Sequence, residues 1–234
     1  MRLLRALICV YLIAGLTVPL GAGVDRVLPS VLTVILDFKG PHSPTSLKEM
    51  KRESGQILHS SGVQLDWRIL GEDPFASYAD LVVMTFKGAC EYEPAAPIYD
   101  ELGPLAITHT TNGQVQPFGE VDCDRVVSSA RTAMSGLDFS RADLLIGRAM
   151  GRVVAHELVH MLTKSGQHGT EGVEKPALSG KQLIAAFLPL SAFDIARLKQ
   201  ERQASGRVTV PVAAFAAAPP AIKSPALHNS SELQ

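Results

Sequence analysis

Two histidines and a glutamate in the pattern His-Glu-x-x-His are the residues of this 234-residue chain that are best suited to metal chemistry. His156 and His160 are four residues apart, so on an α-helix their imidazoles share one face and can reach a single ion at about 2 Å. Glu157 lies beside them, where its carboxylate can take a proton from a metal-bound water that attacks a carbonyl carbon. The pattern predicts hydrolysis with Zn²⁺ as Lewis acid and Glu157 as general base.

A hydrolytic zinc site takes three protein ligands and leaves a position for water, so a third ligand is needed. Gly166 can end the helix in the left-handed conformation, and the turn after it can bring His168 back over the metal. We predict His168 as the third ligand because imidazole suits zinc and because it is close in the chain. Glu171 and Glu174 are the alternatives for this role, and a loop histidine without a ligand role is the simplest interpretation.

The histidines need a helix to bring them together, and the preceding residues predict one over 141–163. Apolar residues recur there at helical spacing, and Ser140 followed by Asp143 resembles a capping box. Gly151 lies one turn before the histidines, where the missing side chain lets another backbone come close at some cost in helix propensity.

The rest of the chain is expected to build a sheet and its covering helices. A helix is expected at 45–61 and a shorter one at 190–198, where Ser191 and Asp194 resemble a second capping box. Strands are expected at 31–38, 63–70, 80–87, 105–110 and 121–128, with a turn at Asn112-Gly113. The first two strands flank a helix, which favours a parallel pair. We therefore expect an α+β fold with a mixed, mostly parallel five-stranded sheet, a crossover helix, an active-site helix and a C-terminal helix.

The two ends of the chain differ in composition from its middle. Residues 1–23 combine Arg2 and Arg5 with an apolar run and small residues suited to cleavage, which predicts a secretory signal peptide. Residues 24–206 are then the single domain, and residues 207–234, rich in alanine and proline, are expected to be a flexible tail.

Cysteine usage and charge narrow the setting in which the chain works. After signal removal only Cys90 and Cys123 remain, and a secreted or periplasmic location favours a disulfide between them, with two buried thiols as the alternative. The formal net charge is −1, and no basic stripe suggests nucleic acid. We expect a monomer that takes a protein or peptide substrate and has no stable membrane insertion.

Other histidines and tyrosines are assigned no role at the site. A lone histidine such as His109 on a strand is more often hydrogen-bonded or solvated than a ligand, and the same holds for His42 and His59. Tyr92 and Tyr99 are suited to polarising a carbonyl group, but the sequence selects neither of them.

The order of elements resembles a known family. One strand, a helix, four strands and then a helix with His-Glu-x-x-His are similar to the metzincin branch of the zinc peptidases over most of residues 31–200, and residues 190–195 resemble the closing helix of matrixin-type members. Thr163 and Gly166 stand where the family has a glycine and its third histidine, so His168 would serve after a longer connection. No methionine follows Met161, so the family's methionine turn is missing.

The resemblance implies a secreted zinc-dependent endopeptidase. Two other functions are compatible with the same residues: a secreted binding module that has lost turnover, and a zinc-dependent amide hydrolase acting on a non-peptide substrate. An edge strand beside the active-site helix would favour a peptide, because an extended chain can bind by adding a strand to the sheet.

Overall fold

The computed structural model of the protein describes residues 30–72, 77–94, 103–204 and 210–211. The predicted signal peptide therefore lies outside the described residues. Of the predicted tail only β7 (Val210–Pro211) is described, and it pairs antiparallel with β3 (Ser77–Tyr78).

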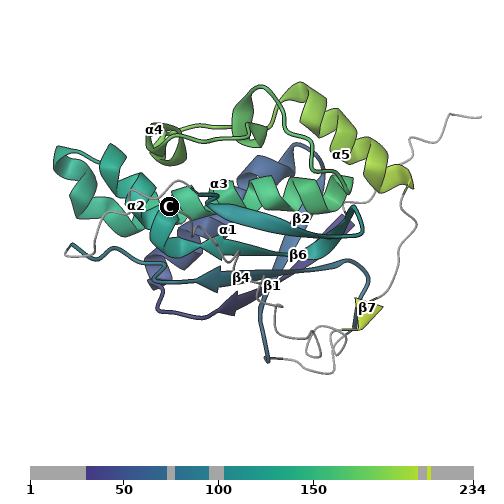
Figure 1. Ribbon diagram of the computed structural model, residues 1–234, viewed down its shortest axis with the longest axis horizontal. Coiled ribbons are helices and arrows are strands. Elements are labelled where there is room, and N and C mark those ends of the chain that lie inside the picture. Colours follow the sequence, from purple (N-terminus) through teal and green to yellow (C-terminus); the bar gives the residue numbers. More distant parts are fainter. Residues whose placement is uncertain (1–29, 73–76, 95–102, 205–209, 212–234) are drawn as a thin grey trace, which may run out of the picture.

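A five-stranded sheet forms the framework of the protein, in the order β2-β1-β4-β6-β5 (Figure 1). Its first four strands run parallel, and β5 alone is antiparallel to its neighbour β6. The predicted α+β fold with a mixed, mostly parallel five-stranded sheet is confirmed. The bounds are β1 (Ser30–Phe38), β2 (Val63–Ile69), β4 (Leu81–Lys87), β5 (Ala106–Thr111) and β6 (Gln114–Asp122).

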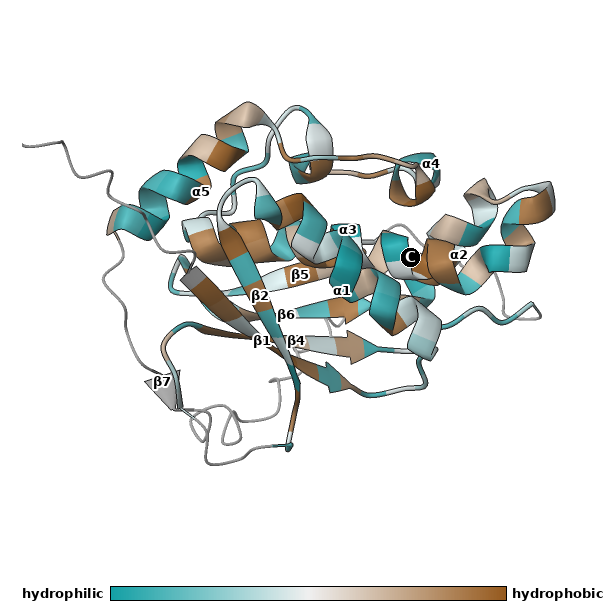
Figure 2. Cartoon of the chain, turned by 180° about the vertical axis from the view of Figure 1, so that it is seen from behind, coloured by the Kyte–Doolittle hydropathy of each residue, from teal (hydrophilic) through white to brown (hydrophobic). Residues whose placement is uncertain are grey.

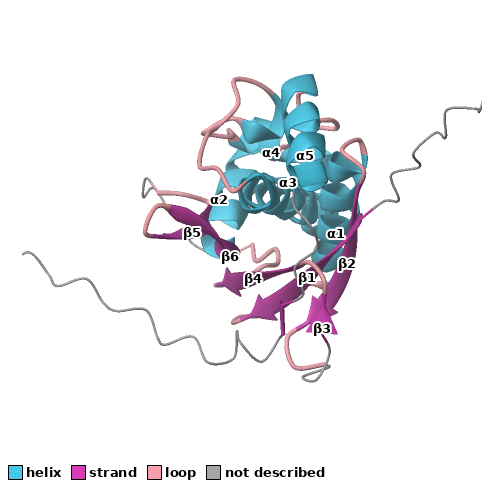
Figure 3. Cartoon of the chain, turned by 90° about the vertical axis from the view of Figure 1, so that its right-hand side faces the viewer, coloured by secondary structure: helices cyan, strands magenta, loops and turns pink. Residues whose placement is uncertain are grey.

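Helices stack in layers over one face of the sheet (Figure 3). The crossover helix α1 (Pro44–His59) and the long helix α3 (Ala142–Thr163) form the nearer layer, and α4 (Gly180–Ile184) and α5 (Ala192–Ala204) lie beyond α3. The core lies between the sheet and α3, and α1 turns a hydrophilic surface outward (Figure 2). Fully buried members of the core include Val34, Leu36, Met84, Phe86, Ile146, Val154 and Leu158.

Two glycines set the distance between α1 and α3. A Cβ on Gly147 would collide with the carbonyl oxygen of Ser46, and one on Gly151 would lie 2.9 Å from the carbonyl oxygen of Met50. Helix axes approach this closely only where side chains are absent, so the predicted close approach at Gly151 is confirmed. This packing fixes the position of α3, which carries two of the three predicted ligands, His156 and His160.

The region from 121 to 141 differs from the prediction. β6 ends at Asp122, and α2 (Cys123–Ala133) replaces the strand predicted over 121–128. The strand prediction was wrong because Asp122 caps a helix, its carboxylate accepting the Arg125 backbone N–H at 3.1 Å. The buried residues Cys123, Val126, Val127 and Ala130 then follow at helical spacing.

The start of α3 also differs from the prediction. A 3₁₀ helix, η1 (Gly136–Arg141), runs directly into α3, so the backbone of Ser140 is already helical and its hydroxyl donates to the Leu137 carbonyl. The predicted capping box at Ser140 and Asp143 is therefore wrong. The Asp143 carboxylate instead accepts the backbone N–H of Tyr92 at 2.8 Å. Half of the second predicted box forms: the Ser191 hydroxyl accepts the Asp194 backbone N–H at 3.0 Å, but the Asp194 carboxylate accepts the Ser191 hydroxyl at 2.6 Å in place of its backbone N–H.

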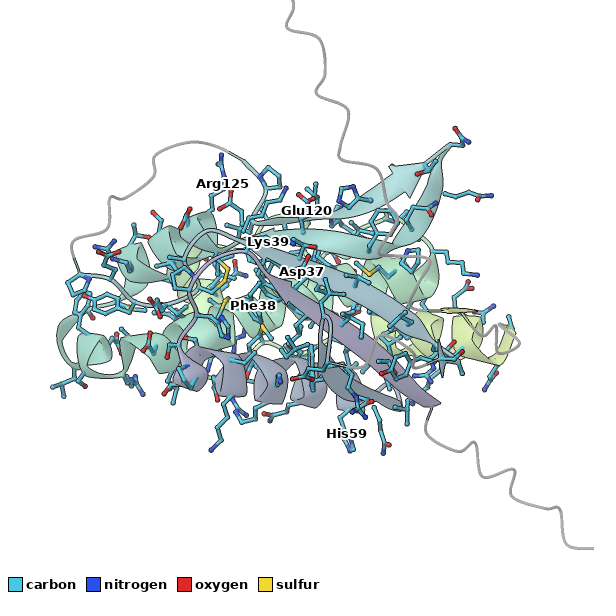
Figure 4. The ribbon with its side chains drawn as sticks, turned by 90° about the horizontal axis from the view of Figure 1, so that it is seen from below. Asp37, Phe38, Lys39, His59, Glu120 and Arg125 are labelled. Carbon is cyan, nitrogen blue, oxygen red and sulfur yellow. A yellow bond between two sulfur atoms is a disulfide. The ribbon has the colours of Figure 1, made fainter. Side chains whose placement is uncertain are left out.

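The opposite face of the sheet carries charged side chains near the ends of the strands (Figure 4). Asp37 and Lys39 form an ion pair at 2.8 Å, and Glu120 pairs with Lys87. The predicted disulfide is present between Cys90 and Cys123 and joins the segment after β4 to the start of α2. No helix in the described part of the chain has both the length and the apolar character needed to cross a membrane.

A pair of glycine substitutions tests the packing of α1 on α3. We expect Gly147→Ala to lower the free energy of unfolding by about 1–3 kcal/mol, because overpacking outweighs the gain in helix propensity. Gly55→Ala in α1 is the matched control, since a Cβ there meets nothing within 4 Å. It should stabilise the protein by about 0.5–1 kcal/mol. Urea unfolding of both variants measures the difference, and equal effects would contradict the described packing.

Candidate metal centre

His156 and His160 lie in the last two turns of α3, with their rings nearly perpendicular at 76° and their Nε2 atoms toward each other. Their Nε2 atoms are 3.0 Å apart. The Nδ1 atom of His156 is 2.9 Å from the carbonyl oxygen of Val173, and that of His160 is 2.7 Å from the carbonyl oxygen of Ser165. Each ring is therefore oriented by a backbone group outside α3.

These carbonyl contacts determine which nitrogen carries the proton. A carbonyl oxygen only accepts hydrogen bonds, so each Nδ1 must donate, and a neutral ring then presents a lone pair at Nε2. Two lone pairs 3.0 Å apart repel unless a proton or a metal ion lies between them. Burial lowers the pKa of both His156 and His160, which disfavours the proton. A metal ion fits this arrangement.

The end of α3 holds His160 through both its backbone and its ring. Lys164 adopts the left-handed conformation, with φ 49° and ψ 36°, and ends the helix. The backbone N–H of Ser165 then donates to the His160 carbonyl, while the Ser165 carbonyl accepts from the His160 ring. The prediction that Gly166 would end the helix in this conformation was wrong, because the chain turns two residues earlier.

His168 completes the group. Its ring centroid is 5.1 Å from that of His156 and 4.8 Å from that of His160. The ligand atoms of the three histidines all lie within 4.8 Å of one another, and among the described residues they are the cluster of metal-ligating side chains that can share an ion. His168 is exposed, so the open side of the group faces solvent. Three imidazoles with one open side match the donor set of a hydrolytic zinc site.

The two glutamates considered as alternative ligands lie elsewhere. Glu174 is fully buried behind His156, with its Oε1 atom 3.6 Å from Nδ1, the ring nitrogen that points away from His160. Burial and the nearby Asp194 carboxylate raise the pKa of Glu174 to about 9, so it is a neutral acid at pH 7. Glu171 precedes η2 (Gly172–Glu174) and does not belong to the histidine cluster.

The support behind His156 comes from the segment before α5. The Val173 backbone N–H donates to the Pro189 carbonyl at 3.0 Å, while the Val173 carbonyl accepts from His156. Gly172 has a φ of 67° and lies directly against the Pro189 carbonyl oxygen, where a Cβ has no room. The Gly169 N–H donates to the Glu174 carbonyl and closes the loop that follows His168. Backbone groups thus hold the His156 ring on the side of Nδ1.

Glu157 lies beside the histidines and is 5% exposed. Burial raises the pKa of its carboxyl group, and a hydrogen bond from Thr108 opposes that shift. The hydroxyl of Thr108, on β5, donates to Oε2 of Glu157 at 2.6 Å. Thr108 was not predicted as a site residue. Period-two alternation along residues 105–110 would have placed it on the face opposite His109.

A cleft of about 520 Å³ opens beside the histidines. Residues of β5, of α3 and of the segment that precedes α4 line it. β5 pairs with β6 on one side, and its other side has no partner strand among the described residues. The larger apolar side chains of the lining include Leu105, Ile107, Val115, Val153, Pro176 and Leu178.

The described residues that were assigned no role lie away from the cluster. His109 faces Glu120 at 3.4 Å and contacts the ring of Phe118, and His42 stacks on Phe38. His59 is in the last turn of α1. Tyr92 packs near Phe139, and Tyr99 lies outside the described residues.

Comparisons with known proteins give likenesses among solved structures. No protein-family model matches the chain, and no curated protein matches it. Among solved structures, it is similar to an archaemetzincin (amzA) from Methanopyrus kandleri, with a TM-score of 0.46 and 13% identity over 77% of this chain and 99% of the other. The resemblance of residues 190–195 to matrixin-type members stays a prediction.

Removal of the exposed histidine tests the donor set. We expect His168→Ala to lower zinc affinity by more than about tenfold, because even the outer partners of metal ligands contribute ten- to hundredfold. His109→Ala and Glu171→Ala are the controls and should keep the wild-type affinity. Competition against a chromophoric chelator measures all three. Wild-type affinity in His168→Ala, or a loss in Glu171→Ala, would contradict the three-histidine site.

Proposed function

We propose that this chain is a secreted zinc-dependent endopeptidase. The observation that carries the proposal is the pair of Nε2 atoms held 3.0 Å apart on α3, with His168 beside them and a buried carboxylate, Glu157, next in the chain. This arrangement has the ligands, the open side and the base that hydrolysis of an amide bond requires.

His156, His160 and His168 would hold the zinc ion as neutral imidazoles. When bound, zinc supplies a Lewis acid that polarises a carbonyl group and lowers the pKa of a water molecule. Glu157 is the general base that takes the proton of the attacking water and then gives it to the leaving amine. Because Glu157 is held in a buried site beside the three histidines, it needs no large rearrangement before the proton moves.

The edge of β5 supports a peptide as the substrate. Its outer N–H and C=O groups have no partner strand among the described residues, so an extended peptide can bind by adding a strand. Such a peptide would run along the cleft past Glu157, which the side chain of Thr108 joins to β5. A strand added along an open edge can continue at both of its ends, so the bond that is cut can lie within a longer chain.

Export is supported by the sequence of residues 1–23 and by the Cys90–Cys123 disulfide, which oxidising compartments favour. In an expression host with a secretion pathway, we expect to find the mature protein outside the cytoplasm, with an N-terminus near residue 24.

Glu157→Gln separates metal binding from hydrolysis. We expect the variant to bind one zinc ion as the wild type does and to lose at least about 100-fold in kcat/KM, because an amide cannot act as a base. Hydrolysis of a mixed peptide library, read by mass spectrometry, measures activity, and elemental analysis measures zinc. Glu120→Gln on the far face of the sheet is the matched control and should leave both unchanged.

Metal removal provides the complementary test. Chelation should abolish cleavage by the wild type, and added Zn²⁺ should restore it. Bound zinc without cleavage of any peptide would favour a binding module, and cleavage confined to non-peptide amides would favour an amide hydrolase. Full activity in Glu157→Gln would exclude the proposed mechanism.

A further inference from the structure

Thr108 joins the edge strand to the proposed catalytic base. Its hydroxyl lies 2.6 Å from Oε2 of Glu157 and 3.4 Å from the carbonyl oxygen of the same residue. Thr108 is partly buried on β5, whereas Glu157 is on α3, 49 residues later in the chain. The contact is therefore tertiary and depends on how the strand and the helix pack.

Two local features bring the strand and the helix together at this point. Gly119 on β6 pairs with Thr108, and a Cβ there would lie 2.8 Å from the terminal methyl group of Met161, so the missing side chain leaves room for Met161 of α3 to pack on the hairpin. The β5–β6 pairing is irregular between Thr108 and Thr110, and irregularities of this kind re-aim side chains. Both features favour contact between Thr108 and Glu157.

A hydrogen bond to a charged acceptor is strong enough to fix a glutamate side chain. Immobilising a glutamate side chain costs rotamer entropy. A hydrogen bond to a charged group is stronger than one between neutral groups and offsets that cost. With Oε2 occupied by Thr108, the carboxylate keeps one orientation and Oε1 is available as the proton acceptor.

We propose that Thr108 is a positioning residue, whose hydroxyl holds the Glu157 carboxylate in its working orientation. Its consequence for catalysis rests on the proposed function, in which Glu157 is the base. Because Thr108 belongs to the strand whose outer edge is open to a peptide, the same element orients both the substrate and the base.

Isosteric replacement tests the role in turnover. We expect Thr108→Val, which removes only the hydroxyl, to lower kcat by about ten- to hundredfold with KM changed by less than about twofold. Thr108→Ser keeps the hydroxyl and should retain most of kcat. Thr85→Val is the matched control, because the Thr85 hydroxyl contacts the carboxylate of Asp37 at 3.4 Å on the opposite face of the sheet. Wild-type kcat in Thr108→Val would overturn the proposal.

A double-mutant cycle in the metal-free protein tests the contact without any measurement of activity. Thr108→Val, Glu157→Ala and the double variant are unfolded in urea. If Thr108 fixes the carboxylate, the double variant loses less stability than the two single losses added together, and additive losses would overturn the proposal. If the wild type binds zinc but cleaves nothing, the proposed function fails, and this cycle alone decides whether Thr108 positions Glu157.

Discussion

Two imidazole nitrogens that face each other at 3.0 Å form the constraint on which the site depends. Neither ring can turn away, because each gives its other nitrogen to a backbone carbonyl, of Val173 or of Ser165. The protein thereby holds two lone pairs in mutual repulsion, an arrangement that becomes favourable when a cation enters. The cost of ordering the two rings is therefore met during folding, by the backbone groups of Val173 and Ser165.

Because α3 carries both rings, the contacts that α3 makes with the rest of the domain set the position of the rings. On one side Gly147 and Gly151 admit α1, and on the other Gly119 admits the helix to the hairpin that carries Thr108. The fully buried Arg152 fixes the same helix through its ion pair with Glu53 at 2.9 Å and through carbonyl groups at the end of α4. The site thus inherits its precision from missing side chains and one buried charge pair.

Much of this architecture could be predicted because its signals are local. The long helix, the β1-α1-β2 unit and the Asn112-Gly113 turn follow from periodicity and turn chemistry within short windows. Features that depend on distant contacts were missed or misplaced: the left-handed residue is Lys164, and Thr108 acquires its role only once β5 meets α3. Pro117 lies within β6, although proline normally interrupts the hydrogen bonds between strands. The sequence therefore did not indicate that this strand begins at Gln114.

The Cys90–Cys123 bond encloses the β5–β6 hairpin in a covalent ring of the chain, with a sequence separation of 33. Closing a loop of this length disfavours the unfolded chain by roughly 3–4 kcal/mol. The ring also means that a single nick in its backbone leaves both new ends tethered to the body of the protein. The disulfide thus keeps β5, which lines the cleft, attached to the protein even where a peptide bond of the hairpin is broken.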